Sequence, residues 1–200
     1  KTTVIPTVVD TGRYAPAPQG DSEPSGPVVI GWIGTPGNFP FLERVVPALR
    51  AVLRERPEVR VRIVSSADCA PLRGVERVEQ VRWAADREVE LLQSFDIGLM
   101  PLVDGPLARG KCAFKMVQYL AVGIPVVVSA VGANVEVMEG TRAGYLLEDF
   151  RDWRDALLAL VDDEDSRAEM GSEGRRRAVE AYSVKAVLPK YLELFQRLRA

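Results

Sequence analysis

The stretch from Gly110 to Ser129 constrains the fold of this chain more than any other. Apolar residues recur in it at every third or fourth position and predict a helix that starts near Lys111 and ends at Gly123. Residues 124–128 then form a short apolar run rich in β-branched side chains. Such a run is typical of a parallel strand covered on both faces. The stretch therefore predicts a loop, a helix, a tight turn and a buried strand.

One flank of this predicted helix is basic. Lys111, Lys115 and Gln118 fall at positions i, i+4 and i+7, so their side chains share one side of the helix. The two like charges repel each other unless an anion lies between them. A helix N-terminus after a glycine-containing loop also favours an anion. The flank predicts an anion site, and the alternative is a solvated basic surface.

Strands and helices alternate along the rest of the chain, which predicts an α/β fold with a Rossmann-like parallel sheet and helices on both faces. Ligands bind to such sheets where the carboxyl ends of the strands meet, so we expect a site formed by the loops 35–38, 82–86, 101–111 and 129–134. The further strands are expected at 3–5, 28–34, 59–64, 75–81, 97–100 and 144–147, and the further helices at 41–54, 88–94, 153–161, 166–182 and 184–199.

Three details of these elements are predicted from single residues or short runs. Pro47 lies inside the helical pattern of 41–54, so it is expected to kink that helix or delay its start. Asp96 is expected to be a structural cap. The basic run 175–177 is most simply a solvated helix face.

Residues 1–27 differ in composition from the rest. They hold five prolines among small polar residues, which predicts a linker running over a surface. Residues 28–200 are then expected to form one Rossmann-like domain with C-terminal helices. The chain starts at Lys1 and not at Met, so we expect it to be a piece of a longer chain whose preceding domain is missing.

The composition narrows the classes of function. The net charge of −2 gives no general attraction to nucleic acid, and the hydrophobic fraction of 47% is ordinary for a globular protein. The chain has no histidine, which excludes Ser-His and Cys-His nucleophile systems and histidine metal sites. Its two cysteines, Cys69 and Cys112, have no metal-ligand spacing and predict a reduced, cytoplasmic setting.

Four segments resemble the C-terminal, nucleotide-sugar-binding half of a family 4-like glycosyltransferase with the GT-B fold. Residues 5–16 are similar to its inter-domain connector, and residues 30–34 to its first strand and glycine turn. Residues 95–101 are similar to the strand before its sugar loop. Residues 114–129 are the most specific match, because they resemble the signature helix and strand of the family over almost their full length.

The resemblance implies that residues 1–27 are an inter-domain connector and that residues 28–200 are a nucleotide-sugar-binding domain. It also implies a hexosyltransferase-like enzyme of glycan biosynthesis. It would take a UDP- or GDP-sugar, retain the anomeric configuration, and need neither a metal nor a cofactor. Its partners would be the nucleotide sugar and the N-terminal GT-B domain of the same parent chain, which holds the acceptor. Nucleic acid is not expected, and peripheral membrane association would come only through the missing half. The isolated fragment is expected to be inactive.

Two other functions remain open. A nucleotide-sugar epimerase of the same fold needs acid and base residues that the sequence does not reveal. A non-catalytic nucleotide-sugar-binding module is favoured by a departure from the family pattern. The family usually has two glutamates eight positions apart, and this chain has Gly110 and Gln118 there. Either the subfamily is divergent or its activity is weakened, and we favour divergence because the helix and its basic residues remain.

The candidate site residues come from these loops and this helix. The family's basic pair after the first strand is absent from residues 35–39, so neutralisation of the diphosphate rests on Arg109, Lys111 and Lys115. Arg109 and Lys111 are assigned as catalytic. Residues 132–134 are expected to close the back of the pocket. The residues assigned to donor binding are Gly34, Gly37, Trp83, Asp104, Lys115 and Gln118. Their structural alternatives are tight turns for the glycines, a half-buried cover residue for Trp83 and a turn residue for Asp104.

Overall fold

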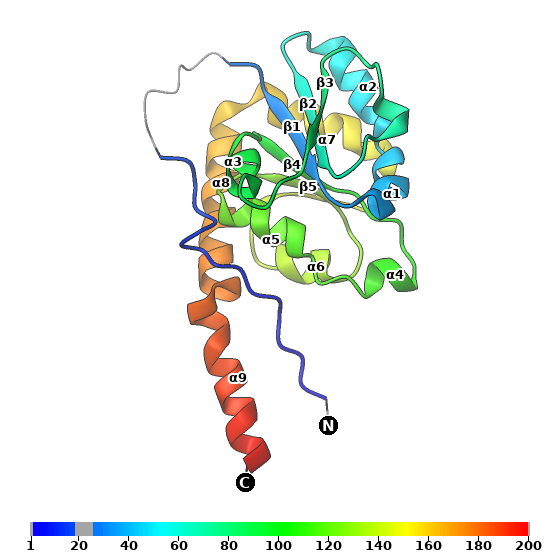
Figure 1. Ribbon diagram of the computed structural model, residues 1–200. Helices are drawn as coiled ribbons and strands as arrows, with labels where there is room; N and C mark the ends of the chain where they lie inside the picture. Colours follow the sequence, from blue (N-terminus) through cyan, green and yellow to red (C-terminus); the bar gives the residue numbers. More distant parts are fainter. Residues whose placement is uncertain (1, 19–25, 200) are drawn as a thin grey trace.

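The computed structural model describes residues 2–18 and 26–199, and within them the chain forms one parallel sheet with helices on both faces (Figure 1). The six strands lie in the order β3-β2-β1-β4-β5-β6. This order confirms the predicted Rossmann-like α/β fold. The strands are β1 (Val29–Ile33), β2 (Arg60–Ser65), β3 (Val78–Arg82), β4 (Ile97–Met100), β5 (Val126–Ser129) and β6 (Gly144–Leu147).

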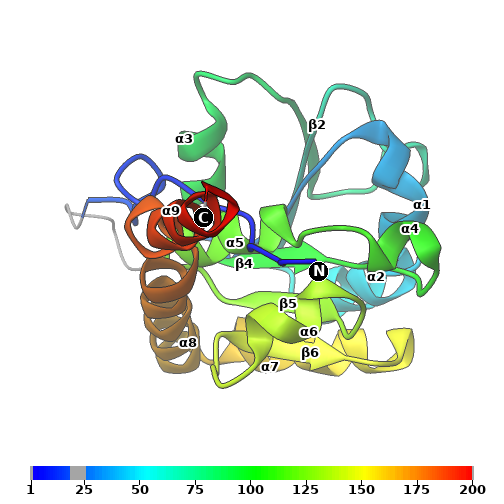
Figure 2. The ribbon, with the colours of Figure 1, turned by 90° about the horizontal axis from the view of Figure 1, so that it is seen from below.

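The helices form two layers, one on each face of the sheet (Figures 1 and 2). One face is covered by α3 (Glu88–Gln93), α5 (Phe114–Ala121), α6 (Ala133–Met138) and α8 (Glu164–Arg177). The other is covered by α1 (Phe39–Glu43), α2 (Val46–Glu55) and α7 (Trp153–Asp162). The shorter segments are η1 (Pro36–Asn38), η2 (Ala70–Leu72), α4 (Pro106–Arg109), η3 (Phe150–Asp152) and the π-helical η4 (Ala178–Tyr182), and α9 (Val184–Arg199) ends the described chain.

The strand order reverses between β1 and β4, and helix α5 packs directly on this position. Gly98 of β4 faces the ring of Tyr119, and a Cβ there would lie 2.6 Å from Tyr119 Cγ. The backbone N–H of Ile33, at the end of β1, donates to Tyr119 Oη at 3.0 Å inside the core. Burial raises the pKa of this phenol, so it stays protonated. Helix α5 is thereby held against the point where such sheets bind ligands.

Several predicted boundaries were wrong for local reasons. The helix expected at 41–54 is divided into α1 and α2, which confirms the effect predicted for Pro47. Pro47 lies in the first turn of α2, where a backbone N–H would have no partner within the helix. Helix α5 begins at Phe114 and not near Lys111, because Ala113 takes a left-handed conformation with φ of 54°. Residues 3–5 form no strand, and helices α4 and α6 were not predicted.

The described part of the expected connector packs on the domain. Val9 is 2% exposed and Tyr14 is 7% exposed. The guanidinium of Arg175 donates to the carbonyl oxygens of Thr11, Tyr14 and Ala121 at 2.9, 2.7 and 2.6 Å. The expectation of a solvated face at 175–177 was therefore wrong for Arg175. The boundary expected at residue 27 follows residues 19–25, which lie outside the described residues.

Helix α9 extends away from the sheet in Figure 1 and is seen nearly end-on in Figure 2. The connector meets the chain just before α9, where the backbone N–H of Val9 donates to the carbonyl of Tyr182, the last residue of η4, at 2.8 Å. Within the described ranges, the helices are too short or too polar to cross a bilayer.

Candidate functional site

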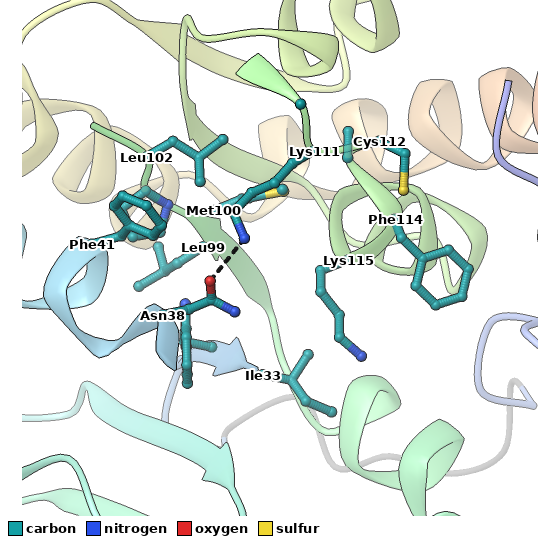
Figure 3. Close-up of a pocket in the computed structure, with 14 residues that line it drawn as sticks. Ile33, Asn38, Phe41, Leu99, Met100, Leu102, Lys111, Cys112, Phe114 and Lys115 are labelled. Carbon is teal, nitrogen blue, oxygen red and sulfur yellow. Dashed lines mark hydrogen bonds between the residues drawn. The ribbon is translucent and has the colours of Figure 1, made fainter. Parts of the chain in front are cut away.

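A cleft of about 310 Å³ opens at the carboxyl ends of β1 and β4 (Figure 3). Its floor includes Ile33 from β1 and Leu99 from β4. The loop before α5 and the first turn of α5 close one side and contribute Lys111, Phe114 and Lys115. The cleft thus lies at the reversal of strand order, which is the expected place for a ligand in this fold.

Lys111 joins the two loops that border the cleft. Its Nζ donates to Asn38 Oδ1 at 2.9 Å and lies 5.6 Å from the centre of the Phe41 ring, as Figure 3 shows for the hydrogen bond. Lys111 was predicted to lie at the start of the helix. This was wrong, because Lys111 lies in the loop that precedes α5. An ammonium group has three donors, and the bond to Asn38 uses one of them. The other two are available to an anion in the cleft.

A second cavity, of about 160 Å³, adjoins the first behind Lys115. Its lining includes Gly34, Thr35 and Trp83, and Lys115 lines both cavities. Trp83 directly follows β3 and is 44% exposed. Its flat apolar ring beside an empty space is suited to stacking against a planar ligand.

The ammonium of Lys115 is paired with Glu88, which begins α3. Lys115 Nζ lies 3.1 Å from Glu88 Oε1, and Trp83 Nε1 donates to the same oxygen at 3.1 Å. The other oxygen, Oε2, accepts from Tyr14 Oη at 2.5 Å and from Gln118 Nε2 at 3.2 Å. The connector, the end of β3 and helix α5 therefore all supply donors to one carboxylate that is 8% exposed as a residue.

These donors keep Glu88 ionised. Burial by itself raises the pKa of the carboxyl, but the hydrogen bond from Tyr14, the charge of Lys115 and the hydrogen bond from Trp83 outweigh it and hold the pKa below its usual value. Burial and the neighbouring carboxylate raise the pKa of Tyr14, which stays a neutral donor. The site thus contains one fixed negative charge beside its two lysines.

Sequence reasoning did not identify Glu88. A usable signal was present, because Leu91 and Leu92 follow Glu88 at i+3 and i+4 and are buried. An acidic residue on the apolar face of a predicted helix is rarely buried unless it has partners. The identity of those partners depends on the tertiary fold.

Gln118 is fully buried and lines none of the cavities described above. Its Oε1 has no hydrogen-bond partner among the described residues. The role predicted for it, a hydrogen bond to ribose hydroxyls, stays a prediction. Gly110 caps the C-terminal end of α4, at the edge of the cleft.

Arg109 and Asp104 satisfy each other in a two-point ion pair. Arg109 Nε and Nη2 donate to the two carboxylate oxygens at 2.7 and 2.6 Å. Both side chains are exposed, and Arg109 lines a third cavity of about 310 Å³ between the connector and α6, together with Gly132. Arg109 could contact a diphosphate, and Asp104 a sugar, only after the ion pair between their side chains has separated, so both predicted roles stay predictions.

The remaining predicted positions are placed as follows. A Cβ on Gly34 would lie 2.6 Å from ring atoms of Trp32, so close packing alone requires glycine there. A Cβ on Gly37 would meet nothing within 4 Å. Asp96 is the cap that was predicted, because its Oδ2 accepts from the backbone N–H of Val29 at 2.7 Å. Asn134 is buried and donates to the carbonyl of Ser129 at 3.0 Å.

Residues 27–163 match the model of the family described as glycosyl transferases group 1, and the chain belongs to this family. A curated relative is the poly(ribitol-phosphate) alpha-N-acetylglucosaminyltransferase of Staphylococcus aureus (strain COL). It is 37% identical over 62 residues, which are 30% of this chain and 13% of the relative.

Solved glycosyltransferases of the GT-B fold share this architecture. Anabaena Alr3699/HepE, solved in complex with UDP and glucose, superposes with a TM-score of 0.78 at 17% identity over 98% of this chain and 56% of its own. S. aureus TarM gives 0.73 at 19% identity over 96% and 39%, respectively.

The C-terminal domain of LpcC from Francisella tularensis gives a TM-score of 0.69 at 18% identity over 88% of this chain and 99% of that domain. The sequence therefore predicted the correct fold, the C-terminal half of a GT-B glycosyltransferase. The chain spans 56% of Alr3699/HepE and 39% of TarM.

Proposed function

We propose that this domain binds a UDP-sugar and, within a longer protein, presents it to an acceptor held by a preceding domain. The observation that carries the proposal is the pair of lysines, Lys111 and Lys115, that line one cleft at the reversal of strand order. Uridine is favoured over guanosine because the solved relative Alr3699/HepE was crystallised with UDP.

The two lysines suit the chemistry of sugar transfer. Negative charge builds up on the diphosphate as the bond to the sugar breaks, and a fixed positive charge nearby stabilises that transition state. Lys111 is positioned by Asn38 and Lys115 by Glu88, so both ammonium groups are held near the cleft before a ligand arrives. We propose that they neutralise the diphosphate without a metal ion and that the sugar keeps its anomeric configuration.

Calorimetry on residues 1–200 tests the binding step. UDP is expected to bind in the millimolar range, about −4 kcal/mol, because the opposite wall of the cleft belongs to the preceding domain. GDP and uridine are expected to bind more weakly than UDP. Failure of both nucleoside diphosphates to bind, or equal affinity for UDP and uridine, would contradict the proposal.

Turnover by the full-length parent tests the catalytic step and separates transfer from a non-catalytic binding role. The parent is expected to transfer sugar from a UDP-sugar to an acceptor, and residues 1–200 alone are expected to bind the donor without transfer. Binding of UDP by a full-length parent that releases no UDP from the sugar nucleotide would favour the binding module. Conversion of the donor into its epimer would favour the epimerase.

A further inference from the structure

The buried carboxylate of Glu88 stands behind the second cavity and in contact with two of its lining residues. Its Oε1 accepts from Trp83 and from Lys115, and both of these side chains line that cavity. Its Oε2 is turned toward Tyr14 and Gln118, which are buried. Oε1 is therefore the oxygen on the ligand side.

A carboxylate offers about four acceptor positions, and here four donors occupy them. A ligand can reach Oε1 only if one of these donors leaves. Lys115 is the donor that is free to do so. Its side chain is 32% exposed, it is flexible, and it also lines the first cleft, where a diphosphate would compete for its charge.

Departure of Lys115 would leave an ionised, desolvated oxygen with an unused acceptor position directly behind the lining of the second cavity, where the Lys115 side chain had been. A hydrogen-bond donor that replaces Lys115 would stabilise this oxygen, because leaving a buried charge unpaired costs free energy. Ribose hydroxyls are such donors, and acidic side chains in Rossmann-like domains accept hydrogen bonds from them.

We infer that Glu88 recognises a ribose hydroxyl of the donor once Lys115 has moved from the carboxylate to the diphosphate. The inference rests on the proposed function. It assigns Glu88, on α3, as the residue that distinguishes ribose from deoxyribose, and Lys115 as the residue that makes this recognition depend on a diphosphate being present.

The test compares the affinities of UDP, 2′-deoxy-UDP and 3′-deoxy-UDP for the unsubstituted protein, here called the parent protein, with their affinities for the Glu88→Gln variant. In the parent, at least one deoxy analogue is expected to bind about tenfold more weakly than UDP, the scale of a hydrogen bond to a charged group. In Glu88→Gln this ratio is expected to fall below about twofold. A role in folding alone would weaken UDP and its analogues by the same factor and leave the ratio unchanged.

A second variant covers the case in which Glu88→Gln does not fold. Glu88→Gln combined with Lys115→Gln removes both charges together, so neither is left unpaired. The same loss of discrimination is expected there. Glu90→Gln is the matched control, since Glu90 lies on the same helix, is exposed, and pairs with Arg87 at 3.1 Å. It is expected to keep the ratio of the parent.

The outcomes separate this inference from the proposed function. If UDP binds and both deoxy analogues bind equally well in the parent, or if discrimination survives in the Glu88 variants, the inference is wrong and the donor site stands. If UDP does not bind the parent, the proposed function and the inference fail together.

Discussion

Lys111→Ala tests the role of the cleft most directly. The substitution removes an ammonium group that lines the cleft and donates to Asn38 Oδ1 at 2.9 Å. A hydrogen bond to a charged group contributes about 1.5–3 kcal/mol, and partial exposure of the side chain to water lowers that contribution. We expect UDP binding to weaken by about 1–3 kcal/mol, which corresponds to roughly 5- to 150-fold in Kd.

The fold of this variant is expected to remain intact. Lys111 and Asn38 are both only partly buried, so water can replace the lost hydrogen bond. The unfolding temperature should therefore stay close to that of the parent. Calorimetric titration with UDP and with uridine separates the diphosphate from the base, because removal of Lys111 should weaken only the ligand that carries phosphate. Lys190→Ala, at an exposed position of α9, is the control and should bind both ligands normally.

Three results would refute this reasoning. Equal losses for UDP and uridine would mean that Lys111 shapes the cleft and does not contact the diphosphate. Normal binding by Lys111→Ala, together with loss of binding in Lys115→Ala or Arg109→Ala, would show that another residue, and not Lys111, neutralises the diphosphate. Normal binding by all three variants would restore the simpler interpretation of a solvated basic surface.

Three further outcomes are expected. EDTA should leave the affinity for UDP unchanged, because the described residues contain no group of three or more metal-binding side chains; binding only with a divalent ion would contradict this. UDP should quench tryptophan fluorescence, and Trp83→Phe should remove part of the change, because Trp83 lines the second cavity and is 44% exposed, whereas Trp32, which lines the first cleft, and Trp153 are buried. Gly171→Ala should destabilise the fold by about 1–3 kcal/mol in chemical denaturation, since its Cβ would lie 2.2 Å from the carbonyl oxygen of Gly123. Gly37→Ala has open space around it and should change stability by less than about 0.5 kcal/mol.

The fold was predictable because its signals are local. Apolar runs and helical spacing mark β1, β2, β4, β5 and β6 in the sequence, and alternation with helices implies a parallel sheet. The start of α5 was not predictable in the same way. Ala113 adopts a positive φ that L-residues rarely take, and nothing in its side chain indicates this. Because the helix begins after Ala113, Lys111 lies in the preceding loop, where it donates to Asn38.

Contacts between distant segments could not be predicted from periodicity. Arg175 belongs to a run of arginines that looks solvated, yet it donates to carbonyl oxygens that lie 54, 161 and 164 residues away in the chain. Each of these bonds depends on how the connector and α5 meet α8. The basic character of Arg175 was visible in the sequence, and its three acceptors were not.

Gly110 and Gln118 stand where the family usually has glutamates, and the structure shows which acidic residue lies near Gln118. Along the sequence, the absence of both glutamates suggests that the site has lost its acidic groups. In the structure, Gln118 Nε2 lies 3.2 Å from a carboxylate oxygen of Glu88, so an ionised acidic group stands beside the position where α5 lacks one. Four donors stabilise this buried charge next to the cleft, because a buried charge is costly unless it is paired and hydrogen-bonded. The arrangement favours a divergent donor site over a decayed one, and loss of ribose discrimination in Glu88→Gln is the result that would confirm it.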